Sequence, residues 1–193
     1  MKKNVVLFWV IFLSLPTSSF SQKNRAFNSI EATKGIHCDS VYQLDLSKQK
    51  LTQLPIEILS FKNLTILNLS KNKLTKLPSN FYQLKQLTHL DLSKNKFTIF
   101  PISLCSTVSL IDLKIGRNDI TLLPKCIGQL TNLEHLDIWD NQISALPDTF
   151  SKLIKLKTLD YRGVNFSSKT QAQIQALIPW VKIEFDLGCD CAH

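Results

Sequence analysis

The chain has 193 residues, of which 44% are hydrophobic, and its formal charge is +8. This length indicates a single domain, and the hydrophobic content excludes a wholly disordered or collagen-like chain. Only 5 glycines and 7 prolines occur, so a low-complexity linker is excluded as well. We therefore expect a folded domain with a buried core.

The N-terminus has the pattern of an export signal. Lys2 and Lys3 precede an apolar run at residues 5–15, which is too short to span a bilayer but typical of a signal-peptide core. Small residues then precede Gln22, which predicts a signal peptide over residues 1–21; the alternative is an uncleaved anchor. Because no second long apolar stretch follows, we expect a secreted or periplasmic protein with no transmembrane segment in the mature chain.

A repeat of 23 residues organises most of the remaining chain. Five copies follow one another without a gap from Tyr42, and a partial sixth copy begins at Lys157. Prolines recur at the same place in each full copy, at positions 55, 78, 101, 124 and 147. Fixed periods of this length are typical of solenoids, in which each repeat is one structural unit.

Each copy carries the pattern L-x-x-L-x-L-x-x-N-x-L, with the second copy complete at Leu64, Leu67, Leu69, Asn72 and Leu74. This pattern, with its Leu-Pro pair, resembles the typical leucine-rich repeat family, as an exported bacterial member. The resemblance implies an α/β leucine-rich repeat solenoid with short parallel strands on its concave face and short helical or irregular turns on its convex face. It implies little about function, because the family serves many unrelated roles.

The residues alone support the same architecture. Leu67 and Leu69 alternate with Ile66 and Asn68, which indicates a strand with one buried face. Stacked repeats would align two apolar columns, and a ladder of asparagines would satisfy backbone groups where the chain leaves each strand. The columns are Leu44, Leu67, Leu90, Leu113, Leu136 and Leu159, and Leu46, Leu69, Leu92, Ile115, Ile138 and Tyr161; the ladder is Asn72, Asn95, Asn118 and Asn141, with Gln49 in the first copy.

The ends of a solenoid need covers. We expect an N-terminal cap at residues 22–41, repeats at 42–166, a C-terminal cap of a helix and a strand at 167–185, and a tail at 186–193. Asn28 and Glu31 have capping-box spacing, and Ser168 is a candidate N-cap for the final helix.

Side chains between the buried leucines should point into the concave face, the usual binding surface of a solenoid. Trp139 stands out because the equivalent position carries only a small residue, Ser or Gly, in the four preceding copies and Arg162 in the next. We expect a non-catalytic module that recognises a protein or peptide; the alternative is that Trp139 only covers a neighbour. The predicted partner-binding residues are Lys114, His135, Asp137, Trp139, Asp140 and Arg162.

Charge is distributed unevenly: residues 22–118 hold 14 Lys and Arg against 6 Asp and Glu, whereas residues 119–193 hold 7 against 9. The basic excess includes a ladder of one cation per copy, which suits an anionic envelope glycan, a lipid headgroup or an acidic protein. The alternatives are simple copying during repeat duplication, or a structural cell-surface protein. Nucleic acid is not expected, because interleaved aromatic residues are lacking. The ladder residues are Lys48, Lys71, Lys94 and Arg117.

No catalytic motif, cofactor motif or close metal-ligand set is evident, so we predict neither an enzyme nor a metal site nor a cofactor. His89 and His135 share a column but lie two rungs apart, about 10 Å. The five cysteines leave pairing open: Cys105 and Cys126 either form a disulfide or remain buried thiols, and Cys38 is too far from Cys189 and Cys191 to bond within one straight monomer. The oligomeric state is not predicted.

Overall fold

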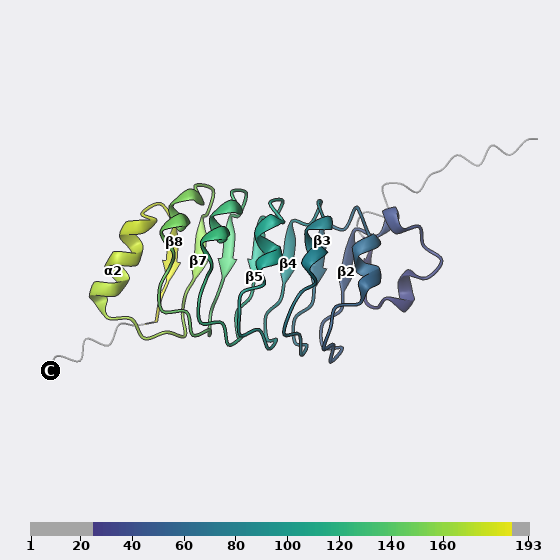
Figure 1. Cartoon of the computed structure of the whole chain (residues 1–193), viewed down its shortest axis with the longest axis horizontal. Coiled ribbons are helices and arrows are strands. Elements are labelled where there is room, and N and C mark those ends of the chain that lie inside the picture. The colour runs from purple at the N-terminus through teal and green to yellow at the C-terminus, as the bar shows by residue number, and fades with distance from the viewer. Residues whose placement is uncertain (1–24, 187–193) are drawn as a thin grey trace, which may run out of the picture.

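The computed structural model describes residues 25–186. The predicted signal peptide and the cysteines of the tail lie outside this range. Figure 1 shows an elongated molecule in which one repeat follows another along the long axis. Within residues 25–186, no helix has the length and apolar character needed to cross a bilayer.

The eight strands within residues 25–186 form one parallel sheet, and their order in the sheet is their order in the chain (Figure 1). Strands of adjacent full repeats pair in register at a separation of 23 residues, so that Leu67 is opposite Leu90. This arrangement confirms the predicted leucine-rich repeat solenoid. The strands are β1 (Ala26–Phe27), β2 (Gln43–Asp45), β3 (Ile66–Asn68), β4 (His89–Asp91), β5 (Asp112–Lys114), β6 (His135–Asp137), β7 (Thr158–Asp160) and β8 (Lys182–Glu184).

Short 3-10 helices supply the return path in each repeat. The five in the full repeats each begin directly after the recurring proline, whose fixed φ suits the entry to a helical turn. Figure 1 shows them stacked in a row along the molecule. The 3-10 helices are η1 (Glu31–Thr33), η2 (Cys38–Ser40), η3 (Ile56–Ser60), η4 (Ser79–Gln83), η5 (Ile102–Ser106), η6 (Lys125–Gln129) and η7 (Asp148–Lys152).

The core includes both apolar columns that the repeat predicts. Every member of both columns is at most 2% exposed. Tyr161 ends the second column, where its hydroxyl donates a hydrogen bond to the carbonyl of Ile143 (3.0 Å) and its ring packs edge-on against Phe166. Burial raises the pKa of this phenol. A tyrosine therefore fits at the last rung because its polar end has a backbone partner.

The asparagine ladder satisfies the backbone as predicted. The Asn95 amide donates to the carbonyls of Leu69 (3.0 Å) and Leu92 (2.9 Å), and its oxygen accepts from the backbone N–H of Leu74 (3.0 Å). Asn72, Asn118 and Asn141 repeat this pattern. Each asparagine thus links its own turn to the preceding repeat.

The N-terminal end differs from the sequence-based expectation. Ala26–Phe27 adds strand β1 to the sheet, so Asn28 follows a strand and does not cap a helix. The predicted capping box is wrong: Ser29, not Asn28, accepts the hydrogen bond from the backbone of Ala32 (3.1 Å). The carbonyl of Asn28 instead accepts from the side chain of Gln49 (2.8 Å), which takes the place of the ladder asparagine in the first repeat.

At the C-terminal end, helix α2 (Ser168–Leu177) leads into strand β8. The N-cap is Ser167, one residue before the predicted Ser168; its hydroxyl accepts from the backbone of Thr170 (3.3 Å). Strand β8 pairs with β7 and extends the sheet by one strand.

A disulfide joins Cys105 in η5 to Cys126 in η6, with 5.6 Å between the two Cα atoms. The sequence left this pairing open because the two cysteines are offset by two positions in adjacent repeats. Cys38 is a free, exposed cysteine. The bond ties two neighbouring repeats together on the side of the 3-10 helices.

Replacing Asn95 with Ala should lower the free energy of unfolding by about 3 kcal/mol, because buried backbone groups of two repeats lose their partners. Urea denaturation measures this change. Asn132→Ala is the matched control, since its amide bonds to the carbonyl of Val108 at an exposed site. A loss at Asn95 no larger than at Asn132 would contradict the structural role of the ladder.

Cys126→Ala should also destabilise the oxidised protein, by about 3 kcal/mol for a closed loop of this length. Cys38→Ala should leave stability unchanged. Urea denaturation compares the variants, and peptide mapping of the unreduced protein tests the bond directly. Alkylation of Cys105 before reduction would show that the bond is absent.

Candidate recognition surface

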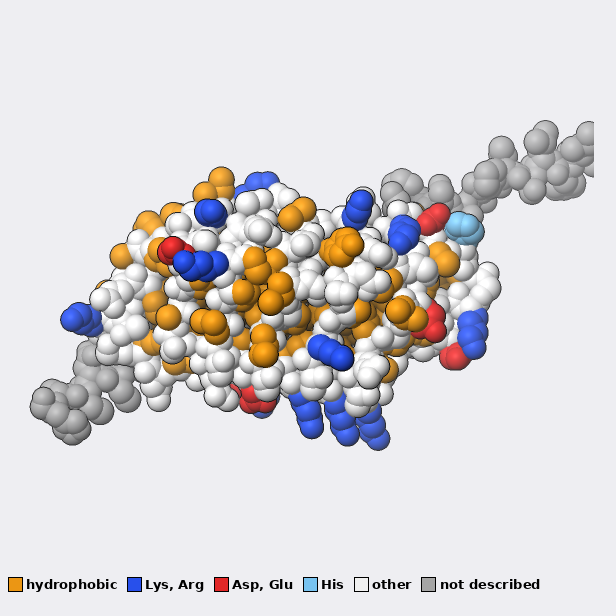
Figure 2. All heavy atoms as spheres, in the orientation of Figure 1, with side chains coloured by type: hydrophobic (Ala, Val, Ile, Leu, Met, Phe, Trp, Pro, Cys, Tyr) orange, Lys and Arg blue, Asp and Glu red, His pale blue; other side chains and the backbone are white. Residues whose placement is uncertain are grey.

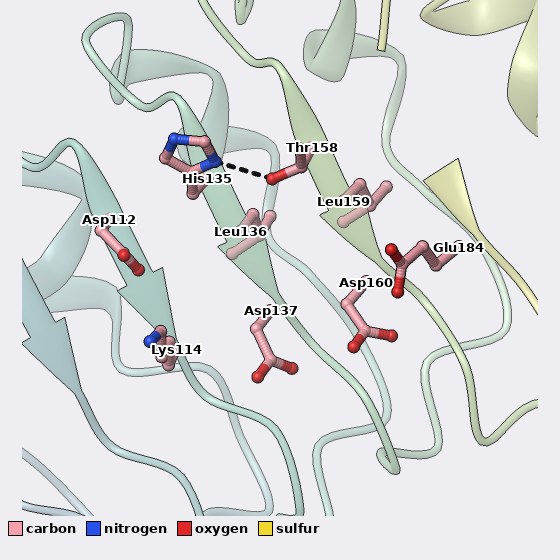
Figure 3. A pocket seen from close by; sticks show the side chains of 9 residues that line it. All are labelled: Asp112, Lys114, His135, Leu136, Asp137, Thr158, Leu159, Asp160 and Glu184. Carbon is pink, nitrogen blue, oxygen red and sulfur yellow. Dashed lines mark hydrogen bonds between the residues drawn. The ribbon is translucent and has the colours of Figure 1, made fainter. Parts of the chain in front are cut away.

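The concave face carries a depression of about 290 Å³ over strands β5 to β8 (Figure 3). Its charged lining comes from alternating strand positions that point away from the core. The His135 ring nitrogen Nδ1 lies 2.7 Å from the Thr158 hydroxyl, a hydrogen bond that joins β6 to β7. The charged and imidazole side chains of the lining are Asp112, Lys114, His135, Asp137, Asp160 and Glu184.

A second depression of about 240 Å³ lies over β3 to β5. Asp112 and Lys114 line both depressions, so the two form one continuous concave surface. His89 lines the second depression and His135 lines the first. Among the residues described, no three potential metal ligands come together.

The last residue of most strands also holds the following turn. Side-chain oxygens of Asp45, Asn68, Asp91 and Asp137 each accept from the backbone N–H two residues further on, at 2.8–3.0 Å. Such Asx turns are a local use of a short polar side chain. Asp137, a predicted partner-binding residue, therefore has a structural role, because its Oδ1 holds the backbone of Trp139.

The fourth repeat departs from this turn. Lys114 stands where the other repeats have Asp or Asn, and Gly116 stands where the first three have Ser. A Cβ atom at Gly116 would lie 2.6 Å from Oδ1 of Asp137 and 3.0 Å from the carbonyl oxygen of Trp139. Glycine is thus required for the fifth repeat to approach the fourth this closely.

Burial raises the pKa of Asp137. Its hydrogen bond from the Trp139 backbone and the charge of Lys114 act in the opposite direction, whereas the nearby carboxylates Asp160 and Asp91 add to the increase. Asp137 is therefore a carboxylate whose charged form the folded protein disfavours.

Trp139 is half-buried and does not stand free of its neighbours. Its ring centroid lies 5.3 Å from the guanidinium carbon of Arg117 and 5.8 Å from that of Arg162, which belong to the preceding and following rungs. Both are cation–π contacts. The structure thus combines the two interpretations of Trp139: the indole covers its neighbours and also lines an open groove.

Carboxylates fix both arginines beside the indole. The Arg162 side chain donates to Asp160 (Nε to Oδ1, 2.9 Å) and lies 3.8 Å from Glu184, and these partners raise its pKa. Arg117 lies 3.3 Å from Asp140. Asp140 and Arg162, both predicted to bind a partner, are therefore already engaged with other residues of the chain.

The basic ladder occupies the turns that follow the strands. Lys48, Lys71, Lys94 and Arg117 all have φ between 56 and 60°, in the left-handed region. Their backbone N–H groups bond to the next repeat at 2.6–3.0 Å, so the spacing of the sheet continues through the turns. Figure 2 shows Lys and Arg side chains projecting side by side from one edge of the molecule.

The ladder and Trp139 line one groove of about 440 Å³. The sequence indicated two separate sites, whereas the structure brings them together, with Asp137 lining both this groove and the concave depression. Four polar lining residues of the depression were not predicted as site residues: Asp112, Thr158, Asp160 and Glu184. The 23-residue repeat could have identified the first three, because each lies 23 residues from a predicted site residue in the same column. Asp112 and Thr158 pair with His135, and Asp160 pairs with Asp137.

Two family models match the chain. One, described as leucine rich repeat, matches residues 39–97, and a second of the same description matches residues 132–153. The chain carries leucine-rich repeats. Many solved structures resemble this leucine-rich repeat chain, 434 of them significantly, whereas no curated protein matches it.

One similar structure is a leucine-rich repeat protein of Leptospira interrogans, with 24% identity, 76% of this chain and 55% of that chain covered, and a TM-score of 0.39. Another is the plant peptide hormone receptor RGFR1 in complex with RGF2, with 28% identity, 63% of this chain and 19% of that chain covered, and a TM-score of 0.54. This leucine-rich repeat chain thus spans about half of the first structure and a fifth of the second.

Asp137→Asn should retain the turn, because Asn68 holds the same turn in the second repeat. The substitution removes a carboxylate whose folded-state pKa is raised. A raised pKa means that ionisation weakens the folded state as pH rises through that pKa. We therefore expect Asp137→Asn to raise the urea midpoint at pH 7 and the gain to disappear as the pH falls to about 4. A lower midpoint at pH 7 would contradict this expectation, because it would show that the ionised carboxylate stabilises the fold.

Proposed function

We propose that this leucine-rich repeat protein is a non-catalytic module that recognises a protein or peptide on its concave surface around Trp139. Leucine-rich repeat proteins are general recognition modules, which supports this assignment.

The contrast between core and concave columns carries the proposal. The core column through Leu136 holds leucine in all six repeats, whereas the concave column through His135 holds a different kind of side chain in almost every repeat. That concave column is Gln43, Ile66, His89, Asp112, His135 and Thr158. The buried column is constant and the exposed column varies. This combination is typical of a solenoid that uses its concave face for binding.

The chemistry of this surface suits a peptide. The depression offers carboxylates, Lys114 and an imidazole, which pair with the backbone and charged groups of a ligand, and Trp139 beside it offers apolar area. The RGFR1 structure was determined with a bound peptide hormone, which supports a peptide partner for a similar fold.

We propose no catalytic role for His135. Its ring contacts the hydroxyl of Thr158 on the next strand, and the ring of His89 contacts the hydroxyl of its sequence neighbour Thr88 (2.8 Å), so a threonine hydroxyl orients each ring. Within the described residues, no carboxylate hydrogen-bonds to the His135 ring, so the orienting group of a nucleophile–base triad is lacking.

Trp139→Ala should weaken binding of peptide ligands about 30-fold or more, the loss expected for a central interface anchor. Ligands are selected from a displayed random-peptide library on the protein, and Kd is then measured by titration. His135→Ala, which leaves the arginine–indole contacts in place, should weaken the same peptides.

Trp180→Ala is the matched control. Trp180 is 46% exposed but precedes strand β8, at the opposite ends of the parallel strands from Trp139. It should change Kd less than twofold. Selected peptides that bind Trp139→Ala and His135→Ala as tightly as the unchanged protein would overturn the proposed surface.

A further inference from the structure

Two rows of lysines follow the strands of the first three repeats. Residues 46–54, 69–77 and 92–100 carry seven lysines and no acidic residue, whereas the rows contain Asp119 in the fourth repeat and Asp140 in the fifth. These segments of three repeats thus form a surface of a single charge. The first row is the lysine part of the basic ladder, Lys48, Lys71 and Lys94; the second row is Lys50, Lys73 and Lys96, and the seventh lysine is Lys76.

The backbone holds both rows at the spacing of the sheet. The N–H of Lys71 bonds to the carbonyl of Ser93 in the following repeat (2.9 Å), and the N–H of Lys73 bonds to that of Leu51 in the preceding repeat (2.8 Å). Adjacent rungs are therefore about 4.8 Å apart at the backbone. The lysines form an array two rows wide rather than a single line.

Neither the turn geometry nor the rest of the chain accounts for this array. A left-handed backbone favours Gly, Asn or Asp, yet four of the lysines have φ between 57 and 60°. Within residues 25–186, no lysine of either row forms an ion pair, so their mutual repulsion is not offset. An anionic partner would offset it.

The groove beside the first row does not suit an anion. Asp91 and Asp137 line it, the Ser93 hydroxyl already donates to Asp91 (2.6 Å), and Ser70 is buried. The lysines of both rows are exposed, and Figure 2 shows Lys and Arg side chains projecting side by side from one edge of the molecule. An anionic partner therefore meets the array from outside, at this edge.

The composition of the array favours a charged surface over a protein or a linear polymer. Protein interfaces are enriched in Arg and depleted in Lys, and in this chain Arg117 makes the directed contacts, with Asp140 and Trp139. Lysine is a compact, strongly hydrated charge, which attracts anions without a fixed geometry. Two rows also face a plane of charges, whereas a linear polymer lies along one row.

An exposed apolar pair follows the second row. Ile99 comes three residues after Lys96, a chain length of at most about 11 Å, and Leu122 has the equivalent position in the next repeat. Their side chains are 72% and 67% exposed. Lysines combined with exposed apolar side chains are typical of surfaces that bind at lipid headgroups.

We infer that this edge docks on an anionic lipid bilayer, with the lysine rows along the headgroups and Ile99 and Leu122 at the headgroup boundary. Lysines near anionic lipids contribute attraction without a pocket. The rows belong to the first three repeats, whereas the concave depression lies over β5 to β8. The inference is therefore independent of the proposed peptide recognition.

Co-sedimentation with lipid vesicles tests the inference. The protein is expressed from Gln22, so that the apolar run at residues 5–15 does not contribute to binding. Phosphatidylcholine vesicles containing about one-third phosphatidylglycerol should bind at least about tenfold more tightly than phosphatidylcholine alone, and added salt should weaken this binding. Equal binding to both kinds of vesicle would overturn the inference. His135→Ala, which alters the peptide surface, should leave vesicle binding unchanged.

Removing the second row should weaken vesicle binding at least about 30-fold, because each lysine at an anionic surface contributes about fivefold. The variant is Lys50→Gln, Lys73→Gln, Lys96→Gln. The control removes the same charge from exposed positions outside the rows and should change affinity less than about threefold. The control variant is Lys85→Gln, Lys152→Gln, Lys169→Gln. An equal loss in both would overturn the inference, because it would show attraction to net charge alone.

Asp119→Lys supplies a gain of binding that misfolding cannot imitate. The change adds a fourth lysine to the second row and should tighten binding to the anionic vesicles at least about fivefold. Glu57→Lys makes the same change of charge in η3 and is the matched control. An equal gain from both substitutions would contradict a specific docking edge.

The apolar pair separates a lipid surface from an acidic protein. The double variant Ile99→Gln, Leu122→Gln should weaken vesicle binding at least about fivefold, since apolar side chains lose contact with the lipid. It should leave binding of soluble polyglutamate unchanged. Unaltered vesicle binding by this variant, or tighter binding of polyglutamate than of vesicles, would overturn the inference and favour an acidic protein segment.

Discussion

The rest of this structure depends on one constraint: a 23-residue repeat cannot bury its own apolar side. Each leucine column is closed only when the next strand pairs in parallel and in register, and the buried asparagines then join the turn of one repeat to the carbonyls of the one before. The same register aligns every other position of the repeat. Columns of concave side chains and of turn cations therefore follow from the packing of the core.

This constraint explains why the two exposed surfaces differ in character. Strand pairing fixes where a concave side chain points but not its type, so neighbouring repeats present Asp112 and His135 at equivalent places. In the turns, pairing continues through backbone N–H groups of residues in the left-handed conformation. The side chains at this position in neighbouring repeats are therefore held one strand spacing apart. When they carry the same charge, the charges form a linear row along the turns.

The repeat architecture was predictable because its signals are periodic: leucine columns, asparagine ladder and prolines recur at a fixed interval. The ends were less predictable, since a two-residue strand such as Ala26–Phe27 has no periodicity and the capping-box spacing of Asn28 and Glu31 competes with it. The Arg117–Trp139–Arg162 contacts depend on how long side chains fold between rungs, which column position alone does not specify. The sequence left the Cys105–Cys126 bond undecided for a similar reason. A two-residue offset between adjacent repeats does not give the distance between the two cysteines, whose Cα atoms are 5.6 Å apart in the structure.

The candidate surface arises where the repeat pattern is broken in a correlated way. Lys114 removes the Asx turn of the fourth repeat, and Gly116 removes the side chain that would collide with Asp137. Asp137 can then hold the backbone of Trp139 while lining both the depression and the groove. Arg117 and Arg162 enclose the indole from the rungs on either side, and each is fixed by a carboxylate. A single substitution from the repeat pattern would not produce this arrangement, because it combines departures in adjacent repeats while the core columns beneath them remain buried.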